Sequence, residues 1–229
     1  MDFFVIIILD IIFIIILGFI FNYNLKKIKA LEKESELDEI AKSYPSNIEM
    51  CKEYLKKLKN ESVTIEENKN SEASLYIAVS NKISIANISN TYTRIQTIAH
   101  ECLHSIQDRK ILMFNFIFSN LYLIFYVLIC ILAIFKVLPN KMMFLNIFLT
   151  ISMVYYMVRI YLENDAMTRA EYLAKEYINE KQNVKKEDIK KLEIGFENVT
   201  KIGIKCVNYT MFLNIMIKIL IFSIICLLR

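Results

Sequence analysis

The chain contains two histidines and no tryptophan among its 229 residues. It also lacks a glycine-rich phosphate loop, and no stretch combines basic and aromatic side chains as a nucleic-acid groove does. There is no internal repeat and no low-complexity linker. These absences give no support to nucleotide or nucleic-acid binding, and they leave the two histidines as the residues with distinctive chemistry.

Cysteine is present, but not in a pattern that binds metal or builds a disulfide framework. The cysteines are odd in number, scattered, and without CxxC spacing. They are Cys51, Cys102, Cys130, Cys206 and Cys226. Such usage is typical of free thiols in a reducing compartment.

Long apolar runs dominate the composition, of which 55% is hydrophobic. Four segments have too little charge for a soluble surface: 3–21, 111–135, 142–162 and 211–228. Each has about 18–25 residues, enough to cross a hydrocarbon core roughly 30 Å thick. Core helices of a soluble protein are rarely apolar on all sides at this length. The first segment has no basic region and no small-residue cleavage site, so we expect a membrane anchor and not a removed signal peptide.

Lysine and arginine gather at one end of each apolar segment. They are Lys26, Lys27, Lys29, Arg109, Lys110, Arg159, Arg169, Lys201 and Lys205. The loop between the second and third segments holds only Lys136 and Lys141. The positive-inside rule then places both termini outside and the polar residues 22–110 and 163–210 in the cytoplasm. The formal net charge of +4 is accordingly interpreted as charge beside a membrane.

The expected fold is an α-helical integral membrane protein with about four transmembrane helices and a small α+β cytoplasmic domain. Its parts, in chain order, are an N-terminal anchor (1–21), a cytoplasmic region (22–110), a transmembrane hairpin (111–162), a cytoplasmic helical region (163–210) and a C-terminal transmembrane helix (211–229). The second cytoplasmic region reads as helical at 163–179 and again at 186–200.

The first cytoplasmic region shows both helical and strand-like patterns. A charged helical stretch covers 24–44, and a second helix is expected at 46–60. Strand-like runs follow at 63–65, 74–79 and 82–86. The dipeptide Ser80-Asn81 suits a tight hairpin turn between the last two runs. We therefore expect a short antiparallel sheet ahead of the histidines.

Residues 91–108 are expected to form a helix, because they contain no glycine or proline and their apolar residues recur at helical spacing. Asn90 or Thr91 can cap its start. His100 and His104 then share one helical face, with Glu101 beside them. This HExxH arrangement is that of zinc metallopeptidases, in which the histidines hold the metal and the glutamate takes a proton from water. The alternative is a polar helix turn with two unrelated histidines.

Catalytic zinc usually has three protein ligands and one open position. The chain has no third histidine, so the third ligand must be Asp, Glu or Cys. Glu163 is the strongest candidate, because two expected membrane crossings return it to the side of His104. Asp165 is the alternative, either as the ligand or as a partner that orients a histidine ring. Cys102 lies two positions from His100 and therefore points to another side of the helix.

The sequence HECLHSIQ at 100–107, followed by two apolar segments and then ENDAMTRA at 163–170, resembles the bacterial YugP-type membrane zinc metallopeptidases. That family has HExGHxxQ and, after two spans, E-x-D-A-x-x-R-A. The resemblance covers nearly the whole chain, including the N-terminal anchor, the strand pair before the zinc helix and the C-terminal span. It implies a zincin-like domain of the gluzincin type that binds one Zn²⁺ per chain.

The resemblance also implies roles for particular residues. The ligands would be His100, His104 and Glu163, with Glu101 as the catalytic base. The residues that match the remaining family positions, and would support the ligands, are Gln107, Asp165 and Arg169. Two positions depart from the pattern: Leu103 stands where the family has glycine, and Met167 stands where related gluzincins have an aspartate that supports a histidine.

The expected activity is that of a zinc-dependent endopeptidase in the bacterial cytoplasmic membrane, with its active site facing the cytoplasm. The expected partners are a peptide or membrane-protein substrate and the lipid bilayer, with no nucleic acid. The main alternative is a catalytically inactive zinc-binding scaffold, and a zinc hydrolase of non-peptide amides is a third hypothesis. Arg94, Arg169 and the tyrosines are the options for a group that stabilises the oxyanion.

Two ionisable residues interrupt apolar segments, Asp10 in the first and Lys218 in the last. Charges at membrane depth are costly and are usually paired or functional. The expected depths of the two residues differ by roughly 5 Å, which a lysine side chain can cover. An interhelical ion pair is one expectation, and a Lys218 side chain that extends toward the membrane surface is the other.

Overall fold

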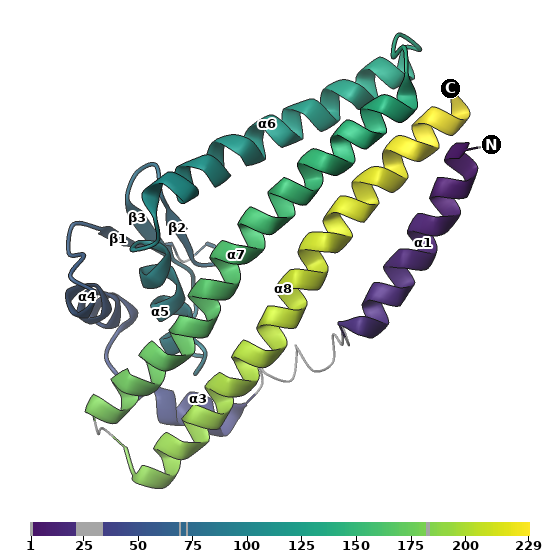
Figure 1. Ribbon diagram of the computed structural model, residues 1–229. Coiled ribbons are helices and arrows are strands. Elements are labelled where there is room, and N and C mark those ends of the chain that lie inside the picture. The colour runs from purple at the N-terminus through teal and green to yellow at the C-terminus, as the bar shows by residue number, and fades with distance from the viewer. Residues whose placement is uncertain (1, 22–33, 69, 72, 182–183) are drawn as a thin grey trace. The chain divides into compact units, whose positions relative to one another are not determined.

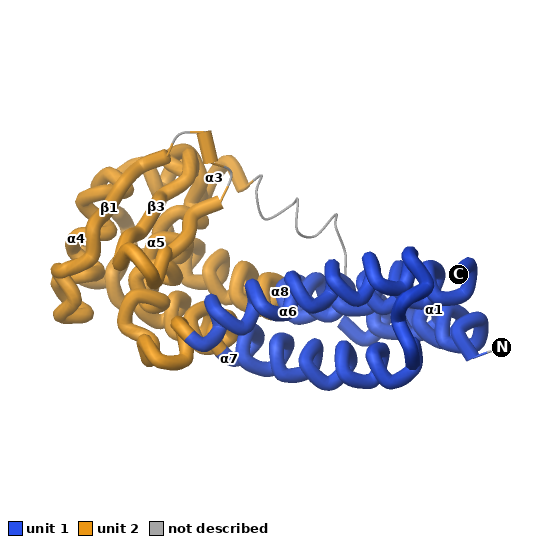
Figure 2. Tube along the Cα trace, turned by 90° about the horizontal axis from the view of Figure 1, so that it is seen from above, with its two compact units in different colours: residues 1–23, 114–161, 205–229 blue, residues 24–113, 162–204 orange. Residues whose placement is uncertain are grey.

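The computed structural model describes residues 2–21, 34–68, 70–71, 73–181 and 184–229, which are mostly helical and include a small β-sheet (Figure 1). The chain divides into two compact units (Figure 2). Unit 1 comprises residues 1–23, 114–161 and 205–229, and unit 2 comprises residues 24–113 and 162–204. The predicted membrane-border residues Lys26, Lys27 and Lys29, and the first half of the charged stretch 24–44, lie outside the described residues.

Four helices of the described residues are long and apolar enough to cross a membrane: α1 (Asp2–Ile20), α6 (Arg109–Ile134), α7 (Lys141–Lys181) and α8 (Lys186–Leu228). They cover the apolar segments expected from the sequence, except that α1 and α6 each end one residue earlier than expected. α7 and α8 also run on through the polar stretches that were expected to be helical. No glycine or proline interrupts α7, so nothing stops this helix where its apolar part ends.

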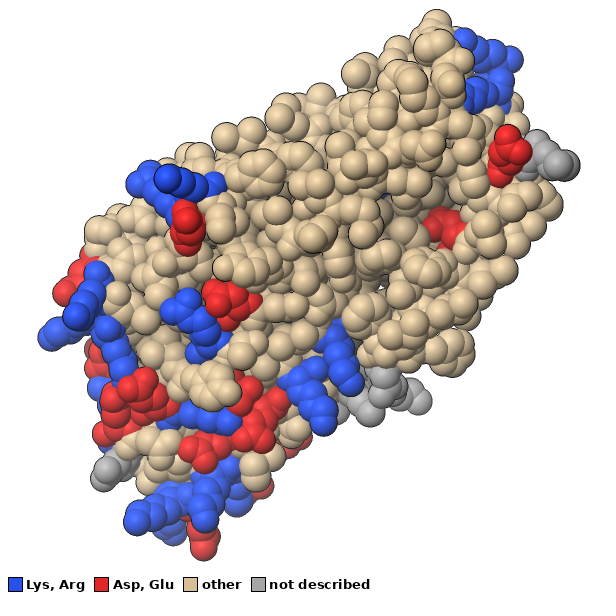
Figure 3. Space-filling view, in the orientation of Figure 1, with Lys and Arg blue, Asp and Glu red and all other residues tan. Residues whose placement is uncertain are grey.

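Aromatic side chains contribute much of the packing within unit 1. Tyr122 of α6 stacks on Phe148 and on Tyr155 of α7, with ring centroids 5.3 and 4.8 Å apart. Phe212 of α8 meets Tyr156 of α7 edge-on at 5.2 Å. The outward side chains of these helices are largely apolar as well, and a broad area of the face shown in Figure 3 carries almost no charge. A surface of this kind is better suited to lipid than to water.

Asp10 and Lys218, which both belong to the described part of unit 1, do not form an ion pair with each other. Lys218 donates a hydrogen bond to Asn214 Oδ1 at 2.6 Å, and its Nζ lies 4.9 Å from the centre of the Tyr122 ring. Asp10 is buried, and its Oδ2 accepts no hydrogen bond from a described residue. The expected interhelical pair is therefore wrong, because Lys218 finds neutral partners on its own helix and on α6.

The described residues of unit 2 include a three-stranded sheet of β1 (Thr64–Glu67), β2 (Leu75–Ile77) and β3 (Lys82–Ile85). The strand order is β1-β3-β2, and β3 is antiparallel to β2 but parallel to β1. The expectation of a purely antiparallel sheet is therefore wrong. β3 takes the central place because Ile83 and Ile85 are fully buried, whereas β1 is largely exposed. The tight turn between β2 and β3 makes these two strands antiparallel, as short hairpin connections do.

The tight turn expected before the last strand is present. Asn81 has a φ of 49°, in the left-handed region that asparagine tolerates. Its side-chain oxygen accepts a hydrogen bond from the Tyr76 hydroxyl at 2.9 Å, and its amide nitrogen donates to Ser62 O. The first bond ties β2 to the turn that leads into β3, and the second ties this turn to the segment before β1.

Two shorter helices precede the sheet in the chain, α3 (Ser35–Ala41) and α4 (Asn47–Lys57). α4 lies inside the helix expected at 46–60. Its first turn has a reciprocal cap, in which Glu49 N donates to Ser46 Oγ and Ser46 N donates to Glu49 Oε2. α4 packs against the helix that carries the two histidines.

That helix is α5 (Arg94–His104), which is shorter than the sequence predicts. Thr93 precedes it and makes no side-chain capping bond. The expected cap at Asn90 or Thr91 is wrong, because α5 begins only at Arg94 and Thr93 therefore occupies the N-cap position. α5 packs against α4 and the sheet, and its buried side forms the centre of the unit 2 core.

Candidate metal centre

α5 presents both histidines on one face. His100 Nε2 and His104 Nε2 are 3.0 Å apart, and the two rings are nearly perpendicular at 86°. The rotation of α5 about its axis is fixed by its other side, where Ile95, Ile98 and Cys102 are fully buried. The direction of the two imidazoles therefore follows from the packing of the core.

Glu163 of α7 completes a group of three metal-ligating atoms. Its Oε2 lies 3.5 Å from His100 Nε2 and 3.6 Å from His104 Nε2. In a tetrahedral zinc site with metal–ligand distances of about 2.0–2.1 Å, any two ligand atoms are about 3.3 Å apart. The three atoms thus have the spacing of a zinc site that leaves a fourth position open. Among the described residues, these three side chains are the group of His, Cys, Asp or Glu whose ligating atoms lie close enough together to hold a metal ion.

The electrostatics of the site favour positive charge. Burial by itself lowers the pKa of His104, but the hydrogen bond and the negative charge of Glu163 outweigh burial and raise that pKa. The negative charge of a carboxylate this close to two half-buried imidazoles compensates the positive charge of a cation bound between them. The donor set and its charge therefore fit a divalent metal such as zinc.

Glu101 lies beside the ligand atoms without belonging to their group. The residue is 6% exposed. Burial raises the pKa of its carboxyl group, and the nearby His100 and His104 offset part of this rise. The backbone of Tyr76 on β2 also hydrogen-bonds the carboxylate. Glu101 is thus a buried carboxylate close enough to both histidines to feel their charge, and it lies outside the group of ligating atoms.

The residues expected to support the ligands are also brought together. Gln107 Oε1 lies 2.8 Å from His104 Nδ1, and Gln107 Nε2 donates to Asp165 Oδ2 at 2.9 Å. Arg169 Nη1 reaches the same Asp165 oxygen at 3.5 Å. Asp165, the alternative third ligand, therefore contacts Gln107 and Arg169 and lies outside the group of ligating atoms.

Two residues considered from the sequence point away from the site. Cys102 Sγ faces Cys51 Sγ at 3.6 Å, and both are buried free thiols. Arg94 is buried and donates to Pro45 O at 2.7 Å and to Ala41 O at 2.8 Å. Cys102 is thus directed away from the metal group, and the Arg94 guanidinium is committed to other carbonyls.

Sequence patterns do not single out Tyr76, although it contacts Glu101. Its contribution comes from the backbone, which every residue has, and its hydroxyl is engaged with Asn81. The one signal in the sequence is the strand-like run that precedes the HExxH helix. That run predicts a strand near the site but not which residue of it meets the glutamate.

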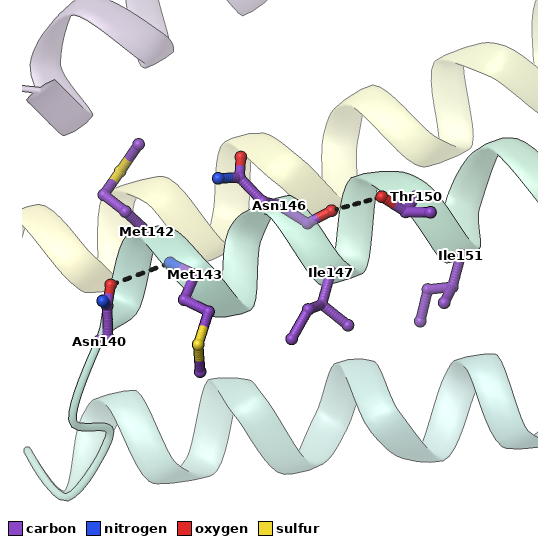
Figure 4. Close-up of a pocket in the computed structure, with 7 residues that line it drawn as sticks. All are labelled: Asn140, Met142, Met143, Asn146, Ile147, Thr150 and Ile151. Carbon is purple, nitrogen blue, oxygen red and sulfur yellow. Dashed lines mark hydrogen bonds between the residues drawn. The ribbon is translucent and has the colours of Figure 1, made fainter.

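A hollow along the first turns of α7 offers no comparable chemistry (Figure 4). It has a volume of about 540 Å³ and is lined by Asn140, Met142, Met143, Asn146, Ile147, Thr150 and Ile151. Its polar groups bond locally: Thr150 Oγ1 donates to Asn146 O, and Met143 N donates to Asn140 Oδ1. None of the lining residues is titratable, so the hollow is not a candidate catalytic site.

Comparisons with known proteins add no identification. No family model matches the chain, and no curated protein and no solved structure matches it. Function is therefore inferred from the residues of the site, their geometry and the sequence pattern around them.

Proposed function

We propose that this protein is a zinc-dependent endopeptidase of the bacterial cytoplasmic membrane. The proposal is carried by one observation, the convergence of His100, His104 and Glu163 with Glu101 beside them. Two imidazole nitrogens and one carboxylate oxygen are a ligand set of catalytic zinc, which keeps a further position open. The resemblance of HECLHSIQ and ENDAMTRA to the YugP-type metallopeptidases supports the same reaction.

The chemistry divides between the metal and Glu101. Bound zinc would supply Lewis acidity, which polarises a peptide carbonyl and brings the pKa of a coordinated water toward about 7. Glu101 takes up a proton from the attacking water and then donates it to the leaving nitrogen. Burial raises the pKa of the Glu101 carboxyl group, which favours a group that must both take up and release a proton.

β2 offers a way to bind an extended substrate. It is an edge strand of the sheet, and its backbone reaches the catalytic carboxylate at Tyr76. A polypeptide that pairs with the outer edge of β2 would pass beside Glu101. We therefore propose extended or unfolded polypeptide segments as the substrate class.

The order of the chain supports a site near the membrane surface. Glu163 directly follows the apolar segment 142–162, and Asp108 lies shortly before the apolar segment 111–135. The distribution of lysine and arginine favours the cytoplasmic side. Membrane proteins, or soluble tails close to the bilayer, are the substrates that such a site would meet.

A zinc-binding scaffold without catalytic activity is the second candidate. Such a protein needs the ligands but gains nothing from a buried carboxylate at Glu101, whose desolvation is costly. Hydrolysis of a non-peptide amide would use the same residues, and only the substrate separates it from peptide cleavage.

The test of the proposed reaction is Glu101→Gln, which keeps the shape of the side chain and removes its ability to take up a proton. We expect the cleavage of internally quenched peptides by the detergent-purified protein to fall about 100- to 10,000-fold, with bound zinc unchanged. The matched control is Glu180→Gln, a change at an exposed glutamate that pairs with Lys57, which should keep full activity. Full activity in Glu101→Gln would refute the mechanism. A wild type that holds zinc and cleaves no peptide would favour the scaffold.

A further inference from the structure

Gln107 uses both ends of its amide at the metal centre. Its Oε1 lies 2.8 Å from His104 Nδ1. Its Nε2 donates to Leu162 O at 2.8 Å and to Asp165 Oδ2 at 2.9 Å. One neutral side chain thus contacts a ligand from α5 and two residues of α7.

The partners of Gln107 determine which way the amide faces. Leu162 O and an Asp165 carboxylate oxygen accept hydrogen bonds and do not donate them, so the NH₂ group must face them. The oxygen then faces His104, and His104 Nδ1 must carry the proton. This leaves the lone pair of His104 on Nε2, the atom that faces His100 and Glu163. The hydrogen-bond network therefore selects the tautomer that binds metal.

The position of Gln107 also links the two helices of the site. Leu162 and Asp165 flank Glu163 on α7, so the amide is fixed to the chain on both sides of the third ligand. Arg169 extends the network by its contact with Asp165 at 3.5 Å. A change in the orientation of His104 is thereby coupled to the placement of Glu163.

The departure of Met167 from the related gluzincin pattern has a structural counterpart. The Met167 methyl lies 2.4 Å from the point where a Cβ would stand on Gly203, so this side chain packs toward α8. Asp165, for its part, contacts Gln107 and not a histidine ring. In the gluzincin pattern a carboxylate would hydrogen-bond the histidine ring directly. Here the Gln107 amide lies between the Asp165 carboxylate and His104 Nδ1.

We propose that Gln107 is a positioning residue that selects the Nδ1–H tautomer of His104 and ties that ligand to the Glu163 segment of α7. The proposal rests on the metal centre of the proposed function, but it concerns how that centre is preorganised. A partner that orients a ligating histidine typically accounts for a 10- to 100-fold difference in metal affinity.

The test compares Gln107→Ala with Gln96→Ala in the full-length protein. Gln96 is a buried glutamine of α5, the helix that ends just before Gln107, and its amide donates to Thr200 Oγ1 at 2.7 Å. Zinc affinity is measured by competition with a chromophoric chelator in detergent. We expect Gln107→Ala to weaken zinc binding about 10- to 100-fold and Gln96→Ala to change it less than about 2-fold. An unchanged affinity in Gln107→Ala, or an equal loss in both variants, would overturn the proposal.

A second readout does not depend on zinc or on activity. Labelling with ¹⁵N-histidine reports on two rings, because the chain has two histidines. In metal-free wild type, at a pH where both rings are neutral, we expect the His104 ring to be protonated at Nδ1 and to lose this preference in Gln107→Ala. A His104 ring without that preference in the wild type would overturn the proposal. If neither the wild type nor any variant cleaved peptides, the proposed endopeptidase activity would be contradicted. The tautomer measurement would still test the positioning role of Gln107.

Discussion

At the scale of single residues, each of the three candidate ligands is oriented by contacts within the protein. The histidines take their direction from the buried side of α5, and His104 has Gln107 behind it. Glu163 stands on α7 between two residues that Gln107 contacts. Such preorganisation lowers the cost of bringing three donors together, which is the general requirement for a tight metal site.

Arg94 is a structural residue whose loss should be costly. Its guanidinium donates to the carbonyl oxygens of Pro45, Ala41 and Tyr44. Arg94→Met keeps the aliphatic stem and leaves these buried acceptors without their donor, so we expect a loss of about 2–4 kcal/mol in the free energy of unfolding of unit 2. Denaturant titration of the detergent-solubilised protein measures it.

The matched variant is Arg169→Met, at a side chain that is 46% exposed and contacts only one carboxylate at 3.5 Å among the pairs described. It should change the free energy of unfolding by less than about 0.5 kcal/mol. Equal effects of the two substitutions would contradict the structural role of Arg94. Any effect of Arg94→Met on peptide cleavage should follow the loss of folded protein.

The sequence predicts the roles of residues that act through the spacing of their side chains, but not the roles that depend on contacts with backbone groups. Spacing places His100 and His104 on one face, and the expected membrane crossings return Glu163 to them; the structure brings these three together. The role of Arg94 depends on carbonyl groups of the turn between α3 and α4, which no side-chain pattern encodes. The contact from Tyr76 is likewise made by backbone.

At the scale of elements, α4 and α5 begin in different ways. α4 has a reciprocal cap between Ser46 and Glu49. α5 begins after Thr93 without such a bond, and the Thr93 hydroxyl donates to Thr91 Oγ1 instead. α5 is therefore fixed at its start by tertiary contacts, among them those of Arg94, more than by local capping.

This difference predicts unequal effects of removing the two hydroxyl groups. Ser46→Ala should cost about 0.5–2 kcal/mol of α4 stability, because an amide of the first turn loses its acceptor. Thr93→Ala should cost clearly less, since no amide of α5 bonds its hydroxyl. Hydrogen exchange of the backbone amides of the two helices measures both effects. A larger effect at Thr93 than at Ser46 would contradict the capping geometry.

Among the elements, the sheet shows where sequence reasoning stops. The three strand-like runs and the Ser80-Asn81 turn are predicted by local patterns and are present. The strand order is not local, because β3 lies between β1 and β2 to bury Ile83 and Ile85. Periodicity identifies strands, but only the competition for buried positions decides which strand is central.

At the scale of the whole molecule, four helices of the described residues could cross a membrane by length and composition. The apolar surface of unit 1 agrees with that assignment. The orientation proposed from lysine and arginine places the loop between α6 and α7 outside and the polar parts of α7 and α8 in the cytoplasm.

This orientation is tested by cysteine labelling of intact cells with a membrane-impermeant maleimide. The background carries Cys130→Ala and Cys206→Ala, because these two cysteines are partly exposed. Asn140→Cys, in the loop before α7, should react from outside. Tyr172→Cys, at a position that is 68% exposed, should react only after the cells are opened. The reverse pattern would contradict the proposed topology.

The central claim is that His100, His104 and Glu163 form one zinc site. The most direct measurement is the zinc content per chain of the detergent-purified protein, for the wild type, for Glu163→Ala and for Glu171→Ala on the same helix. We predict about one zinc in the wild type and in Glu171→Ala, and little or none in Glu163→Ala. Zinc retained in Glu163→Ala would move the third ligand elsewhere, and a wild type that binds no zinc even after reconstitution would contradict the metal centre itself.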